Sequence, residues 1–181
     1  MTRYRYYTAA TLDGFLADEH DSLDWLFTQT LDDTPGTPGR YEDFITEVGA
    51  LVMGATTYAW IGDHLRKTGE AWSYTQPCFV FTHRAFEPLG NGITFVSGTP
   101  GEHRASIEEA AGDRDVWMVG GGALAADFAE SGMLDEVLVS IAPVTLGAGR
   151  PLFPRPFDLR LRDLGRNGSF AVATYDLVGP R

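Results

Sequence analysis

The segment DVWMVGGGALAADF, residues 115–128, sets three consecutive glycines between an apolar run and an amphipathic stretch. Residues 115–119 have the length and apolar content of a strand buried on both faces. Leu124 and Phe128, at positions i and i+4, predict a helix directly after the glycines. A strand that runs straight into a helix points the first helical N–H groups and the positive end of the helix dipole at whatever lies above the strand. We therefore expect a ligand site at this junction.

Gly120, Gly121 and Gly122 indicate what that ligand is. Without Cβ atoms the main chain adopts positive φ freely and a pyrophosphate can approach it closely, which offsets an entropic cost of roughly 0.5–1 kcal/mol per glycine. The alternative is a tight turn in which the glycines only relieve packing. One glycine is enough for such a turn, so three in a row favour anion binding.

The string GGGALA also matches the relaxed dinucleotide fingerprint GxGxxA. In a Rossmann domain that motif follows the first strand and precedes further parallel βαβ units. Here it lies two-thirds of the way along the chain, and the strands expected after it have no helical crossovers between them. A Rossmann domain is therefore not predicted.

Upstream of the glycines, expected strands alternate with expected helices. The pattern predicts strands over residues 4–12, 50–54, 77–82 and 92–97. One helix is expected from Thr37 as N-cap and Pro38 as first helical residue to Gly49; another follows Thr99, which has capping-box spacing to Glu102, and ends at Gly112. This alternation predicts a largely parallel sheet with helices on both faces.

Downstream of residue 132 the pattern changes. Strands are expected over residues 134–144, 157–165 and 169–178, and Asn167-Gly168 between the last two is a strong hairpin signal. The predicted fold is therefore a three-layer α/β/α arrangement with a mixed, mainly parallel sheet and an antiparallel C-terminal hairpin. No repeat or linker composition interrupts the chain, so residues 1–181 are expected to form a single domain.

Composition excludes several classes of partner. The chain has 181 residues, 44% of them hydrophobic, with 14 basic against 25 acidic residues and a net charge of -11. No Lys/Arg run marks a nucleic-acid surface, so no nucleic-acid partner is expected. No run of 18 apolar residues and no secretory signal are visible, so we expect a cytoplasmic protein without a membrane partner.

The remaining reactive residue types are few. Cys78, the only cysteine, lies in the apolar string CFVFT and is expected to be a small core residue. His20, His64 and His103 stand in polar segments without metal-ligand spacing, so no metal site is predicted. No GxSxG elbow indicates acyl transfer.

A second strand end carries polar groups in the string LVMGATTY, residues 51–58. The apolar run ends at Gly54, and Thr56 and Thr57 follow at a turn where a helix can begin. Taken alone, the two hydroxyls are explained as helix caps.

The third strand end is FVFTHR, residues 79–84, which closes with Thr82, His83 and Arg84. A guanidinium fork suits a phosphate because its planar donors bind bidentately, although an exposed arginine is usually solvated surface. Carboxyl ends of parallel strands meet at one edge of a sheet, so three such ends favour a single anion-binding pocket over three coincidences.

Together with TAATLDGFLA (8–17) and DEVLVSIAPVTLGAGRPLF (135–153), the strings LVMGATTY and VWMVGGGALAADF resemble the dihydrofolate reductase-like family. Within it, the chain is similar to the branch related to the reductase domain of bifunctional riboflavin-biosynthesis deaminase/reductases. The resemblance covers nearly the whole chain and implies the same sheet, NADPH as cofactor, and a homodimer as a frequent state.

The resemblance also implies residue roles. NADPH would lie across the strand ends, with Gly54, Thr56 and Thr57 near its phosphates and Thr82, His83 and Arg84 at the 2′-phosphate. The pyrophosphate would lie over Val119, Gly120, Gly121, Gly122, Ala123 and Leu124, and Ala10 and Leu16 would border the nicotinamide.

Departures from the family concern the substrate. Folate reductases carry a carboxylate early in the first helix, two residues after a proline, where this chain has Arg40, so dihydrofolate is not the expected substrate. No second basic cluster is evident for a phosphoribosyl group. Asp13 and Trp25 are the candidate substrate contacts, through a hydrogen bond and ring stacking respectively. A turn at Asp13-Gly14 and a core position for Trp25 are the alternatives.

Two further points stay open at the level of sequence. VTLGAGRPLF, residues 144–153, either lines the pocket or is only a wide connection. The function is either NADPH-dependent reduction of a small heterocyclic, pterin- or pyrimidinone-like, or carbonyl-type substrate by direct hydride transfer, or non-catalytic NADP(H) binding by a sensor or interaction module. No catalytic acid is evident, and the cofactor itself carries the hydride.

Overall fold

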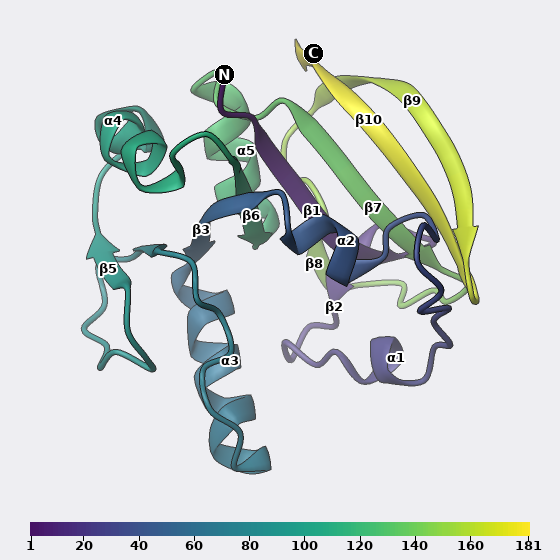
Figure 1. Ribbon diagram of the computed structural model, residues 1–181. Coiled ribbons are helices and arrows are strands. Elements are labelled where there is room, and N and C mark those ends of the chain that lie inside the picture. Colours follow the sequence, from purple (N-terminus) through teal and green to yellow (C-terminus); the bar gives the residue numbers. More distant parts are fainter.

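An eight-stranded mixed sheet runs through the computed structural model, which describes residues 1–181 (Figure 1). In spatial order its strands are β5 (Ile93–Val96), β4 (Cys78–Phe81), β3 (Val48–Gly54), β6 (Asp115–Gly120), β1 (Tyr4–Thr11), β7 (Glu136–Ala142), β10 (Phe170–Pro180) and β9 (Phe157–Asn167). The first six are mutually parallel, and β10 and β9 are antiparallel to their neighbours. The predicted fold class is confirmed.

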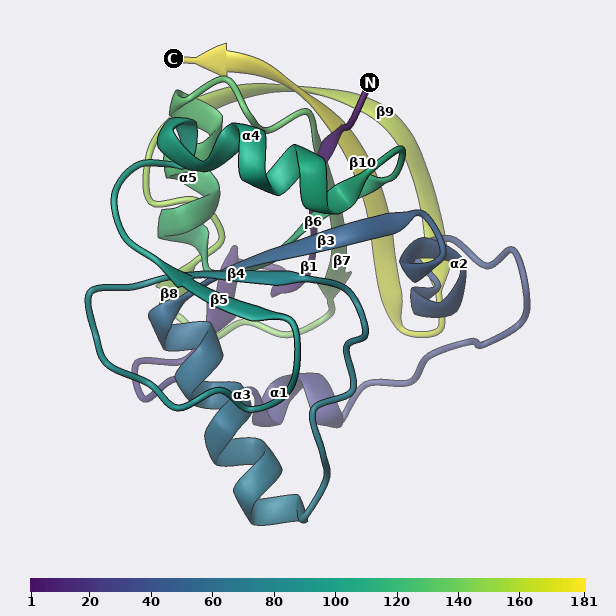
Figure 2. The same ribbon diagram turned by 60° about the vertical axis from the view of Figure 1, so that its left-hand side comes forward.

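Helices cover both faces of the sheet, as Figure 2 shows for α4 and α5 on one side and α3 on the other. On the first face, α4 (Pro100–Ala111) and α5 (Gly122–Glu130) contribute Ile107 and Phe128 to a core that includes Val52 and Met118. Strand β3, buried along most of its length, reads as the continuous apolar run expected of a central parallel strand.

The second face carries the shorter helices α2 (Tyr41–Ile45) and α1 (Asp24–Phe27) and the longer α3 (Ala55–Thr68). Phe44 and Tyr58 pack there against side chains of the central strands, Trp117 among them. Trp25 forms a separate small cluster with residues of β7 and β10 such as Leu138 and Val172.

The helix predicted over residues 38–49 is wrong in both of its boundaries. Arg40 is the N-cap of α2, which ends at Ile45, and Val48 and Gly49 belong to β3. A Cβ on Gly49 would lie 2.1 Å from the carbonyl oxygen of Ala111, so this glycine permits β3 to pack against the end of α4 and does not terminate a helix. That contact is tertiary and leaves no local signal.

Other expected elements are found with small shifts. The capping box at Thr99 opens α4 as predicted. The tight turn between β9 and β10 is Gly168-Ser169, one residue later than predicted, because Asn167 still pairs with Phe170 as the last residue of β9. Three elements were not predicted: α1, and the two strands β2 (Phe15–Ala17) and β8 (Arg150–Pro151), which pair with each other. Their pairing joins segments that are far apart in the chain.

Cys78 is fully buried, as expected, and burial raises the pKa of its thiol to about 12. No helix of the chain combines the length and the apolar character needed to cross a bilayer. No group of three or more histidine, cysteine, aspartate or glutamate side chains gathers closely enough to hold a metal ion.

Candidate functional site

The three strand ends singled out in the sequence are neighbours at one edge of the sheet. Strand β3 lies between β4 and β6, and its register pairs Gly54 with Phe81 and Met53 with Gly120. The carboxyl ends of β4, β3 and β6 therefore lie level with one another. The prediction that these ends meet is confirmed.

Two helices begin at this edge without a side-chain cap. The N-caps of α3 and α5 are Gly54 and Gly121, neither of which has a side chain to accept a hydrogen bond from the first turn. By contrast, the N-terminus of α4 carries its own acceptor, because the Glu102 carboxylate accepts hydrogen bonds from the Thr99 N–H at 2.6 Å and the Thr99 hydroxyl at 2.9 Å. Free N–H groups and two positive dipole ends thus converge on one place, which favours an anion.

The three glycines at the β6–α5 junction are not equivalent. Gly120 has a φ of 152°, and a Cβ built on it would lie 3.3 Å from the Thr57 hydroxyl oxygen, whereas a Cβ on Gly121 has no neighbour closer than 3.9 Å. A Cβ on Gly122 would lie 2.3 Å from the carbonyl oxygen of Pro151. Gly121 therefore leaves main chain partly exposed, Gly120 is buried with a positive φ that favours glycine, and Gly122 relieves packing against β8. Both interpretations of the glycine block apply, each to different residues.

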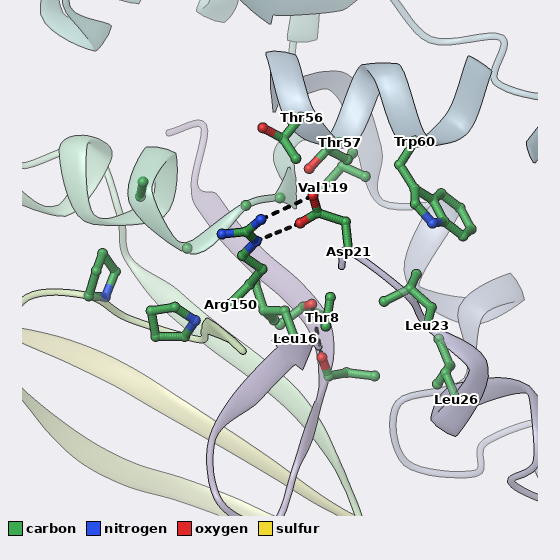
Figure 3. A pocket seen from close by; sticks show the side chains of 18 of the residues that line it. Thr8, Leu16, Asp21, Leu23, Leu26, Thr56, Thr57, Trp60, Val119 and Arg150 are labelled. Carbon is green, nitrogen blue, oxygen red and sulfur yellow. Dashed lines mark hydrogen bonds and ion pairs between the residues drawn. The ribbon is translucent and has the colours of Figure 1, made fainter. Parts of the chain in front are cut away.

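A pocket of about 480 Å³ opens in front of this edge (Figure 3). Its walls come from β1, the β2 region and α1, the first turns of α3, the β6–α5 junction, and the segment around β8. The lining residues are Thr8, Ala9, Leu16, Ala17, Asp21, Leu23, Trp25, Leu26, Thr56, Thr57, Trp60, Val119, Gly120, Gly121, Gly122, Ala123, Arg150, Pro151 and Pro154. The segment 144–153 thus contributes to the pocket through Arg150 and Pro151, which decides between its two interpretations.

Asp21 and Arg150 are the only ionisable side chains that line the pocket, and they pair with each other. Arg150 Nε donates to Asp21 Oδ1 at 2.6 Å, and Nη2 donates to Oδ2 at 3.2 Å and to the carbonyl oxygen of Glu19 at 3.4 Å. The hydrogen bonds to Asp21 raise the pKa of Arg150 further above its already high value. The pair lies in the middle of the pocket in Figure 3.

A short turn holds the Asp21 carboxylate in place. Asp21 has a φ of 62°, the only positive φ of a non-glycine residue in the chain. The Asp18 carboxylate accepts hydrogen bonds from the N–H groups of His20 at 2.8 Å and Ser22 at 2.9 Å, and the Asp21 N–H donates to the Asp18 carbonyl at 3.2 Å. The bonds from Ser22 and His20 lower the pKa of Asp18, so this turn stays formed at neutral pH.

Thr82, His83 and Arg84 follow β4 at the same edge but do not line the pocket. The Arg84 N–H donates to the Thr82 hydroxyl at 2.8 Å, and the Arg84 guanidinium lies 4.7 Å from the centre of the Phe86 ring. No carboxylate pairs with this guanidinium, unlike those of Arg5, which contacts Glu136, and Arg150. Arg84 is therefore an exposed cation with its charge available.

The other predicted cofactor residues divide into two groups. Leu16, Thr56, Thr57, Val119 and Ala123 line the pocket together with the glycines. Ala10 and Leu124 are buried in the core behind it, and Gly54 lies beneath it as the N-cap of α3. The roles of all these residues in holding a cofactor stay predictions.

The two predicted substrate residues differ in position. Trp25 lines the pocket and at the same time packs in the core beside Leu138. Asp13 lies outside the pocket, where its carboxylate accepts hydrogen bonds from the Thr11 hydroxyl at 2.5 Å and from the N–H groups of Leu146 at 3.0 Å and Gly147 at 2.7 Å. Asp13 thus fastens the loop before β8, and these bonds lower the pKa of its carboxyl.

Sequence reasoning missed several lining residues, of which Asp21, Trp60 and Arg150 carry the most chemistry. Trp60 follows Thr56 and Thr57 at helical spacing, and Arg150 stands within the string LGAGRPLF. Both signals were present in the sequence. No sequence signal singles out Asp21, because it lies in a polar stretch that resembles solvated surface.

Comparisons with known sequences give consistent results. The family model for the RibD C-terminal domain matches residues 106–167. Over 149 residues the chain is 31% identical to the uncharacterized protein YwjB of Bacillus subtilis (strain 168), covering 81% of this chain and 80% of YwjB. It is 26% identical over 163 residues to the riboflavin biosynthesis protein RibD of Corynebacterium ammoniagenes, covering 85% of this chain but 47% of that protein.

Solved structures show the same fold. A protein from Shewanella sp. PV-4, provisionally assigned to riboflavin biosynthesis, superposes with a TM-score of 0.77 at 24% identity and covers 98% of this chain and 99% of its own. The Thermotoga maritima diaminohydroxyphosphoribosylaminopyrimidine deaminase/5-amino-6-(5-phosphoribosylamino)uracil reductase superposes with a TM-score of 0.64 at 15% identity, covering 97% of this chain and 56% of that one. The chain thus corresponds to little more than half of the bifunctional protein.

Proposed function

This chain belongs to the family of the RibD C-terminal domain, a reductase-related family, and from that premise we propose that it is an NADPH-dependent reductase of a small substrate. The family supports an oxidoreductase in general terms. The observation that carries the proposal is the pair of uncapped helix N-termini at Gly54 and Gly121, which open onto one pocket beside uncovered main chain.

The residues at this edge fit a dinucleotide phosphate bridge. Gly121 leaves room that a side chain would fill, and the first turns of α5 and α3 direct N–H groups at the same space. The hydroxyls of Thr56 and Thr57 lie at the start of α3 and line the pocket. In this proposal the pyrophosphate lies over residues 120–123. When bound, the cofactor supplies the hydride.

A preference for NADPH over NADH follows from Arg84. Its guanidinium lies at the edge next to the pocket, makes no ion pair, and is backed by the Phe86 ring. A guanidinium held by one aromatic face keeps its donors free for a phosphate. We assign the 2′-phosphate to Arg84, with Thr82 and His83 beside it.

The rest of the lining suits orientation and exclusion of water. Leu23, Leu26 and Trp60, on the side of Asp21 away from Arg150 in Figure 3, give that part of the pocket an apolar character. A substrate ring held there is shielded from bulk solvent, which strengthens the polar contacts at its reacting atoms. Asp21 is the only carboxyl that lines the pocket, and Arg150 engages it. The proton that accompanies reduction is accordingly assigned to solvent.

Calorimetric titration with NADPH and NADH tests the cofactor assignment. Gly121→Val should abolish binding of both with the fold retained, because no atom lies within 3.9 Å of the added Cβ. Arg84→Ala should weaken NADPH by about 1–3 kcal/mol through loss of a charge-assisted bond while leaving NADH nearly unchanged. Arg114→Ala, which removes an exposed arginine in the turn before β6, is the matched control.

Three outcomes contradict these assignments. Absence of heat with either nucleotide removes the reductase proposal. An equal loss for NADPH and NADH in Arg84→Ala removes the 2′-phosphate role of Arg84. Unchanged affinity in Gly121→Val removes the glycines from the site.

A binding protein without turnover is the second candidate function. The observation that favours it is the engagement of the only lining carboxyl, Asp21, in an ion pair, which leaves no free acid in the pocket. Tight NADPH binding with no oxidation by any member of a panel of pterins, pyrimidinones and quinones would support this candidate over the reductase.

A further inference from the structure

The charges within the pocket cancel. One cation, Arg150, and one anion, Asp21, line it, and the two join through two hydrogen bonds of 2.6 and 3.2 Å. The next nearest acceptor of Arg150 is the carbonyl oxygen of Glu19. No second lysine, arginine or histidine reaches the pocket wall. A bound molecule therefore meets no unpaired positive side chain there.

The ion pair presents its carboxylate to one side of the pocket and its guanidinium to the other. In the view of Figure 3, Asp21 lies between Arg150 on one side and Leu23, Leu26 and Trp60 on the other. A ligand at the apolar end therefore faces the carboxylate of the pair first. A phosphate placed at that end would meet a negative group, with the guanidinium behind it already occupied.

The surroundings of the apolar end add to this effect. Residues 18–24 carry four carboxylates, those of Asp18, Glu19, Asp21 and Asp24, and no lysine or arginine. The turn in this segment is held by the bonds of Asp18 to His20 and Ser22, so the position of Asp21 is set by the fold. Of these four only Asp21 lines the pocket, but the segment as a whole is negative, and charges of one sign near a cleft repel ligands of the same sign.

We propose that the apolar end takes an uncharged ring compound and excludes phosphorylated and other anionic substrates, and that Asp21 is the residue that sets this specificity. The inference rests on the proposed function, which assigns the glycine end to the cofactor. It distinguishes this chain from the Thermotoga protein, whose name specifies a phosphorylated uracil substrate.

Two pairs of ligands, whose members differ by one anionic group, test the proposal. One pair is naphthoquinone and naphthoquinone sulfonate; the other is 5-amino-6-(5-phosphoribosylamino)uracil and the same compound without its phosphate. Binding is measured by calorimetry with and without NADP⁺. In each pair that binds, we expect the uncharged member to bind about 10-fold more tightly than its anionic partner, because repulsion by one carboxylate is comparable in size to one charge-assisted contact.

Variants locate the effect. Asp21→Asn keeps the side-chain shape, and asparagine tolerates the positive φ at this position, so the variant should fold. It should reduce the preference for the uncharged over the anionic ligand by about 10-fold. Adding Arg150→Gln to Asp21→Asn should restore only part of the preference, because the freed guanidinium is then absent but the repelling carboxylate is absent as well. Asp158→Asn removes an exposed carboxylate that lies 3.7 Å from Arg181 on strand β9, outside the pocket, and should leave the preference as it is.

The outcomes are decisive in each case. Failure of both uncharged compounds to bind, an anionic member that binds as tightly as its uncharged partner, or an unchanged ratio in Asp21→Asn overturns the proposal. A charge preference seen without NADP⁺, in a protein that binds no nicotinamide nucleotide, would instead contradict the proposed function and leave the specificity of the apolar end intact.

Discussion

The two ends of the sheet each carry arginine–carboxylate contacts, but in opposite surroundings. At the amino end, Glu136 opens β7 with a side chain that is 1% exposed and contacts Arg3, Arg5 and Arg162, the first two at 2.6 Å. At the carboxyl end, the side chains of Asp21 and Arg150 are 37% and 54% exposed at the pocket. The same chemical pairing is core structure at one end and pocket lining at the other.

Burial explains the difference. Loss of solvent alone would raise the pKa of Glu136, but hydrogen bonds from Arg5 and Arg162 outweigh this effect and hold the pKa below its usual value. Such a buried carboxylate is destabilising if any partner is removed. An exposed pair contributes about 0–1 kcal/mol, because water solvates both partners when they separate. Asp21 and Arg150 can therefore respond to a ligand at little cost in stability.

The largest expected effect is that of Glu136→Gln. It leaves Arg5 without its best partner, and the free energy of unfolding should fall by about 3 kcal/mol, the lower end of the range for a broken buried pair because Arg3 and Arg162 are each 43% exposed. Chemical denaturation at neutral pH measures this loss. Asp158→Asn, at an exposed pair, is the control. A loss below about 1 kcal/mol would show that the buried contacts of Glu136 contribute no more to stability than an exposed ion pair does.

The same residue predicts a pH dependence. Because the pKa of Glu136 is lower in the folded chain, its contribution is fully present above the usual glutamate value of 4.5 and is lost as the pH falls through the folded pKa. The difference in unfolding free energy between wild type and Glu136→Gln should therefore shrink on acidification. Denaturation curves of both proteins, recorded from neutral pH down to about pH 3, measure it. A difference that does not change with pH would show that Glu136→Gln destabilises the protein through packing and not through loss of the ionised carboxylate.

A smaller effect is expected within the glycine block. Gly122→Ala places a Cβ 2.3 Å from the Pro151 carbonyl oxygen and should lower stability by about 1–3 kcal/mol, as overpacking does. Gly121→Ala meets no atom within 3.9 Å and should change stability little. Thermal unfolding of the two variants compares a packing glycine with an open one. Equal losses of stability in the two variants would contradict the distinction between a packing role for Gly122 and an open position for Gly121.

The smallest effect on stability is expected for Asp21→Asn. The pair it breaks is exposed, so unfolding free energy should change by less than about 1 kcal/mol even as ligand preference shifts. Denaturation measured alongside ligand titration separates the two quantities. A larger destabilisation would show that the turn at residues 18–22 depends on the ion pair.

The sequence predicted which strand ends meet at the edge of the pocket, because its signals are local. Three glycines, two threonines after Gly54 and the string ending at Arg84 each follow an apolar run of strand length. Parallel strands place their carboxyl ends together, and the register of β4, β3 and β6 confirms it. The pair of Asp21 and Arg150 escaped prediction, since the two residues are 129 positions apart and meet only through the pairing of β2 with β8.

By itself, the sequence determined which strands are parallel, that an antiparallel hairpin ends the chain, and where glycines join a strand directly to a helix. These features depend on periodicity and on glycine, which act over a few residues. Tertiary structure alone decided that Gly49 belongs to a strand packed on α4, that Gly122 is a packing glycine, and that Asp13 fastens a loop while Asp21 faces the pocket. Each of these roles depends on an atom contributed by a distant segment, and no local pattern specifies such a neighbour.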